Sequence, residues 1–192
     1  ASAAGPALGR IALDGIPRAL AALDVDGDDD LELAIAGGDR ELWIHGCGAA
    51  GGARAWFDGR PPRVWTVDAI PLALAVADFD ADGRDDLVVL HHYHLSALVL
   101  SGLSADGPRR RAKVYAGQTP GGLAVLDVDV DGRPDVVVAN RDTQGLGLLL
   151  GDGAGALETS ASVPLGDFPN ALASAGAAPG ALRLVALDAK SN

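Results

Sequence analysis

The chain has 192 residues, of which 48% are hydrophobic and 4% are aromatic, and its formal net charge is −11 at pH 7. That length allows one domain or two small ones, and so acidic a chain is repelled by nucleic acid, which we therefore exclude as a partner. No apolar run reaches the roughly 18 residues of a membrane-spanning helix, and the single cysteine, Cys47, excludes an internal disulfide.

Short apolar runs bounded by Gly, Pro and Asp recur along the chain, and none shows a sustained helical period, so the predicted elements are strands. Residues 1–8 are expected to form a flexible lead-in, and residues 9–14 a first short strand. Three repeats of four strands and a partial fourth repeat follow. The predicted strands are 19–25, 31–36, 41–45 and 63–70, then 72–79, 87–92, 97–100 and 112–116, then 123–128, 136–139, 146–150 and 157–165, then 171–175 and 182–187.

Four prolines set the register of these repeats independently of the strands. Pro17, Pro71, Pro120 and Pro169 each begin a similar run, at intervals of 54, 49 and 49 residues. Four strands per repeat of about 50 residues are typical of a β-propeller. We therefore predict an all-β fold in which residues 9–192 form propeller repeats. The expected blades are 17–70, 71–119 and 120–168 with a partial blade at 169–192, which makes the chain a fragment of a larger propeller or a half-ring.

An acidic nine-residue loop begins seven residues after each of the first three prolines. The loops Asp24–Glu32, Asp78–Asp86 and Asp127–Asp135 carry acids at positions 1, 3, 5 and 9, and together they hold 15 of the 26 acidic residues. Glycine at position 6 of the second and third loops suits a sharp turn with positive φ. The corresponding place in the fourth repeat, Gly176, has no acids around it, so no fourth site is expected.

Aspartates on alternate residues repel one another, and a hard divalent cation with oxygen ligands, Ca²⁺ before Mg²⁺, relieves that repulsion. We predict about three bound Ca²⁺ ions, with carboxylates at positions 1, 3, 5 and 9 and the backbone carbonyl at position 7 as ligands. The predicted ligands are Asp24, Asp26, Asp28, Asp30 and Glu32 in the first loop, Asp78, Asp80, Asp82, Arg84 and Asp86 in the second, and Asp127, Asp129, Asp131, Arg133 and Asp135 in the third.

The Asp-x-Asp-x-Asp-Gly-x-x-Asp loops, the Val-Val-Ala-Asn that ends at Asn140, and the glycine-rich run Leu148–Gly155 resemble the FG-GAP/VCBS repeats. The first loop departs from that pattern, because Asp29 replaces the glycine and Glu32 the last aspartate. The resemblance implies a calcium-binding propeller like those of integrin alpha chains and many secreted bacterial proteins. It also implies a secreted, periplasmic or cell-surface location, where calcium is plentiful enough to fill structural sites.

The propeller face opposite the acidic loops is expected to bind a protein or glycan ligand, by analogy with other propellers. Two clusters on that face have both a functional and a plain interpretation. His91–His94 is either a transition-metal site or a polar loop rich in aromatics, and Asn140–Gln144 is either a sugar or peptide site or an ordinary polar loop. Arg109–Arg111 is expected to be a solvated basic tip.

No catalytic set emerges from the sequence, so we expect a non-catalytic binding or adhesion module. Gly46–Gly51 matches Gly-x-Gly-x-x-Gly, but no βαβ unit surrounds it, and Cys47 lacks an orienting partner for nucleophilic chemistry. The alternatives are part of a larger propeller enzyme or lectin, or a structural subunit of an extracellular assembly. Self-association or further blades would then complete the ring through the open blade edges.

Overall fold

A computed structural model of the chain describes residues 13, 15–28, 30–46, 48–50, 53–55, 61–165, 169–175 and 183–188. These residues form sixteen strands, and none of them lies in a helix long and apolar enough to cross a membrane. The expected lead-in at 1–8, Cys47, Asp29 and the surroundings of Gly176 lie outside the described residues. The strand expected at 9–14 does as well, apart from Leu13, which lies in no strand.

The first sheet is antiparallel and has the order β1-β2-β3-β6. A short hairpin of two further strands is inserted between β3 and β6, in a segment where the sequence predicted only a loop. The strands are β1 (Ala19–Leu23), β2 (Glu32–Gly37), β3 (Glu41–His45), the hairpin strands β4 (Gly48–Ala50) and β5 (Ala53–Ala55), and β6 (Arg63–Thr66).

The second and third sheets repeat this antiparallel order without an insertion, and a two-stranded sheet follows them. Their strands are β7 (Pro71–Ala77), β8 (Asp86–His91), β9 (Ser96–Ser101) and β10 (Arg110–Tyr115), then β11 (Pro120–Leu126), β12 (Asp135–Asn140), β13 (Gly145–Gly151) and β14 (Leu157–Pro164), then β15 (Pro169–Ala175) and β16 (Arg183–Asp188). Each predicted strand from residue 19 onward is present, with its ends shifted by a few residues.

The repeat prolines mark the first residues of β7, β11 and β15. In each case the pairing register shifts directly after the proline, between Pro71 and Ala73, Pro120 and Gly122, and Pro169 and Ala171. Proline has no N–H to donate to the ladder, so it suits the start of a strand and an adjoining irregularity. The proline landmark in the sequence therefore reports where each blade begins.

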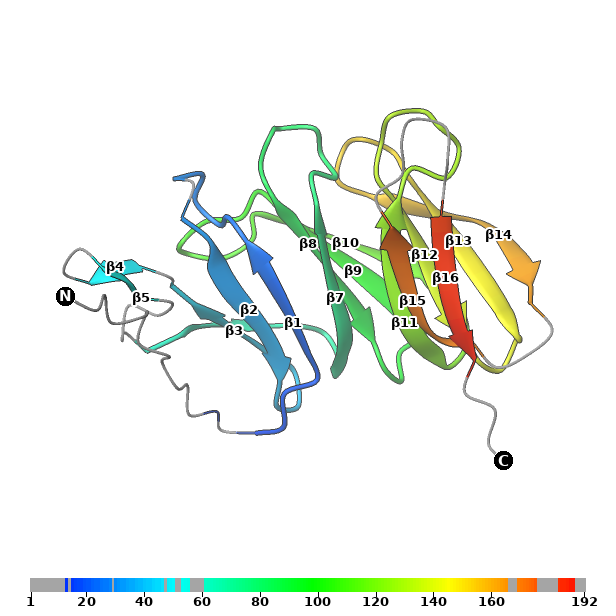
Figure 1. Ribbon diagram of the computed structural model, residues 1–192, viewed down its shortest axis with the longest axis horizontal. Coiled ribbons are helices and arrows are strands. Elements are labelled where there is room, and N and C mark those ends of the chain that lie inside the picture. The colour runs from blue at the N-terminus through cyan, green and yellow to red at the C-terminus, as the bar shows by residue number, and fades with distance from the viewer. Residues whose placement is uncertain are drawn as a thin grey trace, which may run out of the picture.

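The sheets stand beside one another like the blades of a fan, with the first strand of each sheet toward the common centre (Figure 1). β1 packs against β7, β7 against β11, and β11 against β15. This is the arrangement expected of propeller blades, with three complete blades and two strands of a fourth among the described residues.

Apolar side chains fill the space between successive blades. One cluster joins the first two blades, for example through Leu42 and Leu98, and a second joins the next two through Val88 and Val136. A third cluster joins the third blade to Leu172 of β15. Every residue of β8 and of β12 is buried, as the unbroken apolar runs predicted for strands covered on both faces.

Candidate metal centres

The three acidic loops connect β1 to β2, β7 to β8 and β11 to β12, and they lie along the same edge of the fan, at the top in Figure 1. The ninth residue of each loop is also the first residue of the second strand. It pairs directly with the residue before the loop, as in Leu23↔Glu32, Ala77↔Asp86 and Leu126↔Asp135. The β-ladder therefore closes each loop at the same point.

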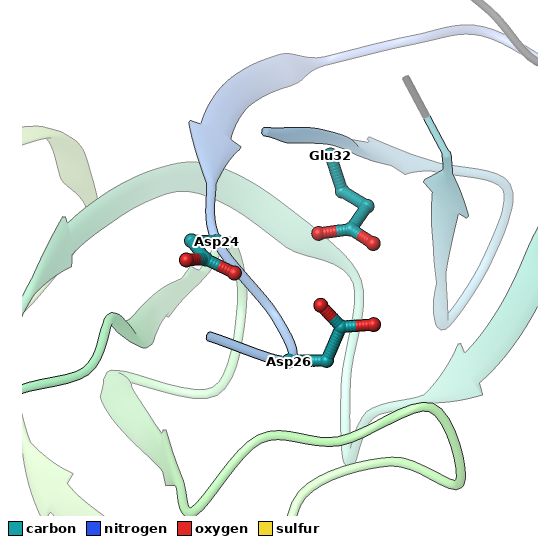
Figure 2. A group of neighbouring side chains, drawn as sticks. All are labelled: Asp24, Asp26 and Glu32. Carbon is teal, nitrogen blue, oxygen red and sulfur yellow. The ribbon is translucent and has the colours of Figure 1, made fainter. Parts of the chain in front are cut away.

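Each loop brings the carboxylates at positions 1, 3 and 9 together. In every loop, one oxygen from each of the three acids lies within 4.8 Å of the others. Figure 2 shows the first of these groups, which we call the triads, with the side chains of Asp26 and Glu32 directed toward each other and Asp24 beside them. The triads are Asp24, Asp26 and Glu32; Asp78, Asp80 and Asp86; and Asp127, Asp129 and Asp135.

The acid at position 9 is the buried member of each triad. Asp86 and Asp135 are each 1% exposed. Asp86 Oδ2 accepts hydrogen bonds from the N–H groups of Phe79, at 2.9 Å, and Asp80, at 3.2 Å. Asp135 accepts from Val128 at 2.7 Å through Oδ2 and from Gly151 at 2.8 Å through Oδ1. These carboxylates hold the loop against its own strands.

The second triad carries an electrostatic cost that a cation would relieve. The pKa of Asp86 is raised to about 6, chiefly by burial and also by the neighbouring Asp80 carboxylate, against the lowering effect of the backbone N–H donors. Asp80 Oδ1 is buried and has no hydrogen-bond partner among the described residues. An unpartnered buried carboxylate oxygen beside a second buried carboxylate is the environment that a hard cation stabilises.

The first triad differs because a guanidinium donates a hydrogen bond to one of its carboxylates. Glu32 Oε2 accepts a hydrogen bond from Val25 N–H at 3.0 Å, and Glu32 Oε1 accepts one from Arg63 Nη2 at 2.8 Å. Burial raises the pKa of Glu32, and the backbone bond and Arg63 oppose that rise. Part of the charge that a metal would supply in this loop is therefore supplied by Arg63, which lies 31 residues further along the chain.

The position 1 carboxylate shapes the turn of each loop. Asp78 accepts hydrogen bonds from the N–H groups of Asp82 and Gly83, and Asp127 accepts the same pair of bonds from Asp131 and Gly132. Asp24 Oδ1 accepts one from Gly27 at 2.7 Å. These bonds curl the backbone around the carboxylate that the sequence placed first among the ligands.

The position 5 carboxylates, which the sequence also predicted as ligands, are not members of the triads. Each of them accepts the N–H of the residue at position 7, in the pairs Asp28 with Asp30, Asp82 with Arg84, and Asp131 with Arg133. The Arg133 guanidinium also binds the Asp131 carboxylate and holds its pKa below the ordinary value. The structure thus groups three of the four predicted carboxylates in each loop.

Backbone conformation reveals a feature that the sequence analysis missed. Gly83 and Gly132, at position 6, have φ of 84° and 86°, as predicted. Position 4 is also left-handed, with φ of 78° at Gly27, 57° at Ala81 and 63° at Val130. Glycine at position 27 was the available signal, because left-handed φ is unfavourable for residues with a Cβ.

The three histidines of the segment 91–94 differ in burial, from buried His91 to exposed His94. His91 is fully buried, its Nδ1 lies 3.1 Å from Ser96 Oγ, and burial lowers its pKa to about 4. His92 packs edge-on against Tyr93, with ring centroids 3.9 Å apart. Within the described part of the chain, no potential metal-binding group contains a histidine. His91 therefore belongs to the space between blades, and the polar-loop interpretation suits the three residues after it.

The segment 140–144 is divided in the same way. Asn140 is the last residue of β12 and is 3% exposed, whereas the next four residues, from Arg141 onward, are all exposed. Thr119 Oγ1 donates a hydrogen bond to the Asp142 carboxylate, which links this turn to the start of β11. The structure therefore places Asn140 inside the crevice between blades and the rest of the predicted ligand loop on the face opposite the triads.

Searches for relatives found no matching family model and no matching curated protein. Several solved structures are similar in fold, and two of them are described here. One is BBS1N in complex with ARL6DN, soaked with lead, with a TM-score of 0.64, 15% identity, and coverage of 92% of this chain and 51% of that chain. The other is the same complex soaked with mercury, with a TM-score of 0.61, 15% identity, and coverage of 88% and 46%.

These matches and the sheet order define the class of protein: the chain is a partial β-propeller, whose described residues form three four-stranded blades and part of another. It spans about half the length of the chains that it matches. At 15% identity the likeness establishes the fold and carries no information about individual residues.

Proposed function

We propose that the chain is part of a calcium-stabilised, non-catalytic β-propeller of the FG-GAP/VCBS type, which binds a protein partner outside the cell. The observation that carries the calcium proposal is the recurrence of the triad. Three separate loops each place the carboxylates of positions 1, 3 and 9 within 4.8 Å of one another, at equivalent points of three blades. Recurrence at one structural position is hard to explain by surface acidity alone.

The donor set suits calcium. Each triad offers carboxylate oxygens, which Ca²⁺ prefers, and the surrounding loop leaves the coordination flexible. A bound Ca²⁺ would neutralise the repulsion of the three acids and tie the loop to the first residue of the second strand. In the second loop, Asp80 and Asp86 are the residues with most to gain, because both are partly or fully withdrawn from water.

The binding proposal rests on the fold. The structurally similar BBS1N chains were solved in complex with ARL6DN, which supports a protein partner for a propeller of this shape. The face away from the triads is the surface we assign to that partner, and it includes the exposed turn after Asn140. Extracellular calcium modules have dissociation constants of about 10⁻⁴–10⁻³ M, so these loops would be filled outside the cell and largely empty in the cytosol.

The test is a calcium titration by calorimetry. The unmodified chain should bind about three equivalents, and the double variant Asp78→Asn with Asp80→Asn should lose one of them. The matched control is Asp106→Asn, an exposed aspartate outside the loops, which should leave the stoichiometry unchanged. Calcium at ten times the dissociation constant should also raise the unfolding free energy by about 1.4 kcal/mol per site. No heat at millimolar calcium, or a stoichiometry that ignores the double substitution, would overturn the calcium proposal.

A further inference from the structure

A cavity of about 360 Å³ lies between the second and third blades, at the ends of strands that point away from the triads. Tyr115 and Gly117 line it from the second blade, and Asn140, Gly147 and Ser162 from the third. Its volume is at the small end of the range of about 300–1,000 Å³ for ligand pockets. The cavity contains no residue of the acidic loops, so it is independent of the calcium proposal.

The neighbouring crevice, between the first and second blades, shows why this space is open. His91 and Asn140 hold the same place, since each pairs with the proline that begins its blade. Leu98 and Gly147 also correspond. Leu98 lies seven residues after His91 and Gly147 seven residues after Asn140, each on the third strand of its blade. Leu98 is 1% exposed and belongs to the core between the blades, whereas Gly147 has no side chain and the Asn140 amide lies where its Cβ would be.

The edge of the two crevices differs as well. In the first crevice Lys113, which pairs with Leu98 across the strands, lies 3.7 Å from Asp68. In the second crevice Ser162, which pairs with Gly147, takes the place of the lysine, and Gly117 takes the place of Asp68 three residues before the proline. Charged groups close the first crevice, and small neutral residues leave the second open.

Two glycines give the Asn140 side chain its position. A Cβ on Gly117 would lie 2.2 Å from Asn140 Nδ2, and a Cβ on Gly147 would lie 2.8 Å from the same atom. Gly117 also has φ of 101°, a conformation that side chains rarely adopt. The amide is thus held between the blades, in a space that no other residue type at these two positions would allow.

The amide of Asn140 is buried with an unmet acceptor. The residue is 3% exposed, and its Oδ1 has no hydrogen-bond partner among the described residues. A buried acceptor left without a donor is costly, so it identifies a place where a donor is expected from outside the protein. A hydroxyl group of a ligand within the cavity would supply that donor.

The remaining lining defines the chemical class of the ligand. None of the described residues that line the cavity is charged, and its exposed rim carries the Tyr115 ring together with the hydroxyls of Thr143, Ser160 and Ser162. Thr159 lies on the same rim, and its hydroxyl is already used, because it donates to Tyr115 O at 2.8 Å. An aromatic ring, several hydroxyls and a fixed amide suit a neutral molecule with many hydroxyl groups.

We propose that this cavity binds a neutral saccharide of one or two rings, with the Asn140 amide accepting a hydroxyl hydrogen bond at its floor and the Tyr115 ring covering one sugar face. The site extends the proposed function rather than restating it, since it adds a glycan ligand to a module assigned a protein partner. It lies in the crevice beneath the exposed turn, so both ligands would meet the same face of the propeller.

The test is saturation-transfer NMR on the folded chain in excess calcium. The probes are glucose, galactose, mannose and N-acetylglucosamine, with glucuronate as a charged counterpart. At least one neutral sugar should bind, and glucuronate should bind more weakly. Asn140→Ala should weaken the affinity about tenfold, because the hydrogen bond to the buried amide is lost. Gly147→Leu, which copies the residue of the first crevice, should abolish binding.

The controls separate a site from general stickiness and from unfolding. Asn170→Ala removes the same amide from an exposed position outside the cavity and should leave the affinity unchanged. Tyr115→Ala, at a half-exposed rim residue, should keep the melting temperature and weaken binding severalfold, so it remains informative if Asn140→Ala fails to fold. The proposal is wrong if no neutral sugar binds the folded chain, or if the Tyr115 and Gly147 variants bind as the unmodified chain does. Neither outcome of the sugar experiment bears on the calcium proposal, which the calorimetric titration tests separately.

Discussion

The first acidic loop and the other two solve the same electrostatic problem in different ways. Asp86 and Asp135 are buried aspartates whose hydrogen bonds come from backbone N–H groups. Glu32 has a longer side chain, is 8% exposed, and forms an ion pair with the Arg63 guanidinium. The comparison shows that a loop with a metal-binding sequence pattern can have one of its carboxylates paired with an arginine from elsewhere in the chain. We therefore expect the first loop to depend least on calcium.

The largest expected effect comes from removing a buried carboxylate that the loop cannot replace. Asp135→Ala leaves the N–H groups of Val128 and Gly151 without their acceptor, and each buried donor left unpaired costs about 1–3 kcal/mol. We expect a loss of about 3 kcal/mol in the unfolding free energy. Urea unfolding in EDTA measures it without any contribution from calcium.

Asp131→Ala is the matched control, because the same residue type is removed from the same loop. Asp131 is held by Arg133 near the surface and lies outside the triad, so we expect little change in stability without calcium. If the two variants lost the same stability in EDTA, the view of Asp135 as the residue that fastens the loop would be wrong.

An intermediate effect is expected for substitution of Arg63, because it removes the feature that distinguishes the first loop from the other two. Arg63→Gln removes the charge partner of Glu32, whose side chain is 10% exposed, and leaves a largely buried carboxylate. We expect a loss of about 1–3 kcal/mol in EDTA, most of which calcium restores, because the first loop then resembles the other two. The measurement is urea unfolding with and without millimolar calcium.

Arg40→Gln, at an exposed arginine of the same blade, should change neither value. A loss at Arg63 that calcium does not restore would mean that the guanidinium acts through packing rather than through the charge of the triad. The Arg63 variant therefore sharpens the comparison in either case, since it separates an internal cation from a structural side chain.

The acidic loops and their strands were predictable because the causes are local. Alternating acids, a glycine at position 6 and a proline at the start of each blade lie within about twenty residues of one another, and apolar runs fix the strands between them. The spacing did not reveal that Asp28, Asp82 and Asp131 each accept a hydrogen bond from their own loop backbone and lie outside the triads.

The features that escaped prediction depend on contacts between distant segments. Arg63 meets Glu32 only because β6 lies at the edge of the first blade. Asn140 was assigned to a surface loop, and it is buried because Gly117 and Gly147, on two other segments, leave room for its amide. His91, at the equivalent strand end of the second blade, is buried as well. A polar residue at a strand end gives no local signal of which side of a crevice it will occupy.

The smallest expected effect concerns position 4 of the acidic loops, where a substitution should increase rather than decrease the unfolding free energy. Val130 is 80% exposed and adopts φ of 63°, a conformation that its branched side chain disfavours, whereas the first loop has Gly27 at the same position. Val130→Gly should raise the unfolding free energy by about 0.5–1 kcal/mol, since relief of strain exceeds the added chain entropy of glycine. Urea unfolding in EDTA tests it, with Ala81→Gly as the matched substitution in the second loop and a smaller expected gain. A loss of stability at position 130 would show that the valine side chain makes a contact worth more than the strain, and the equivalence of the three turns would then not hold.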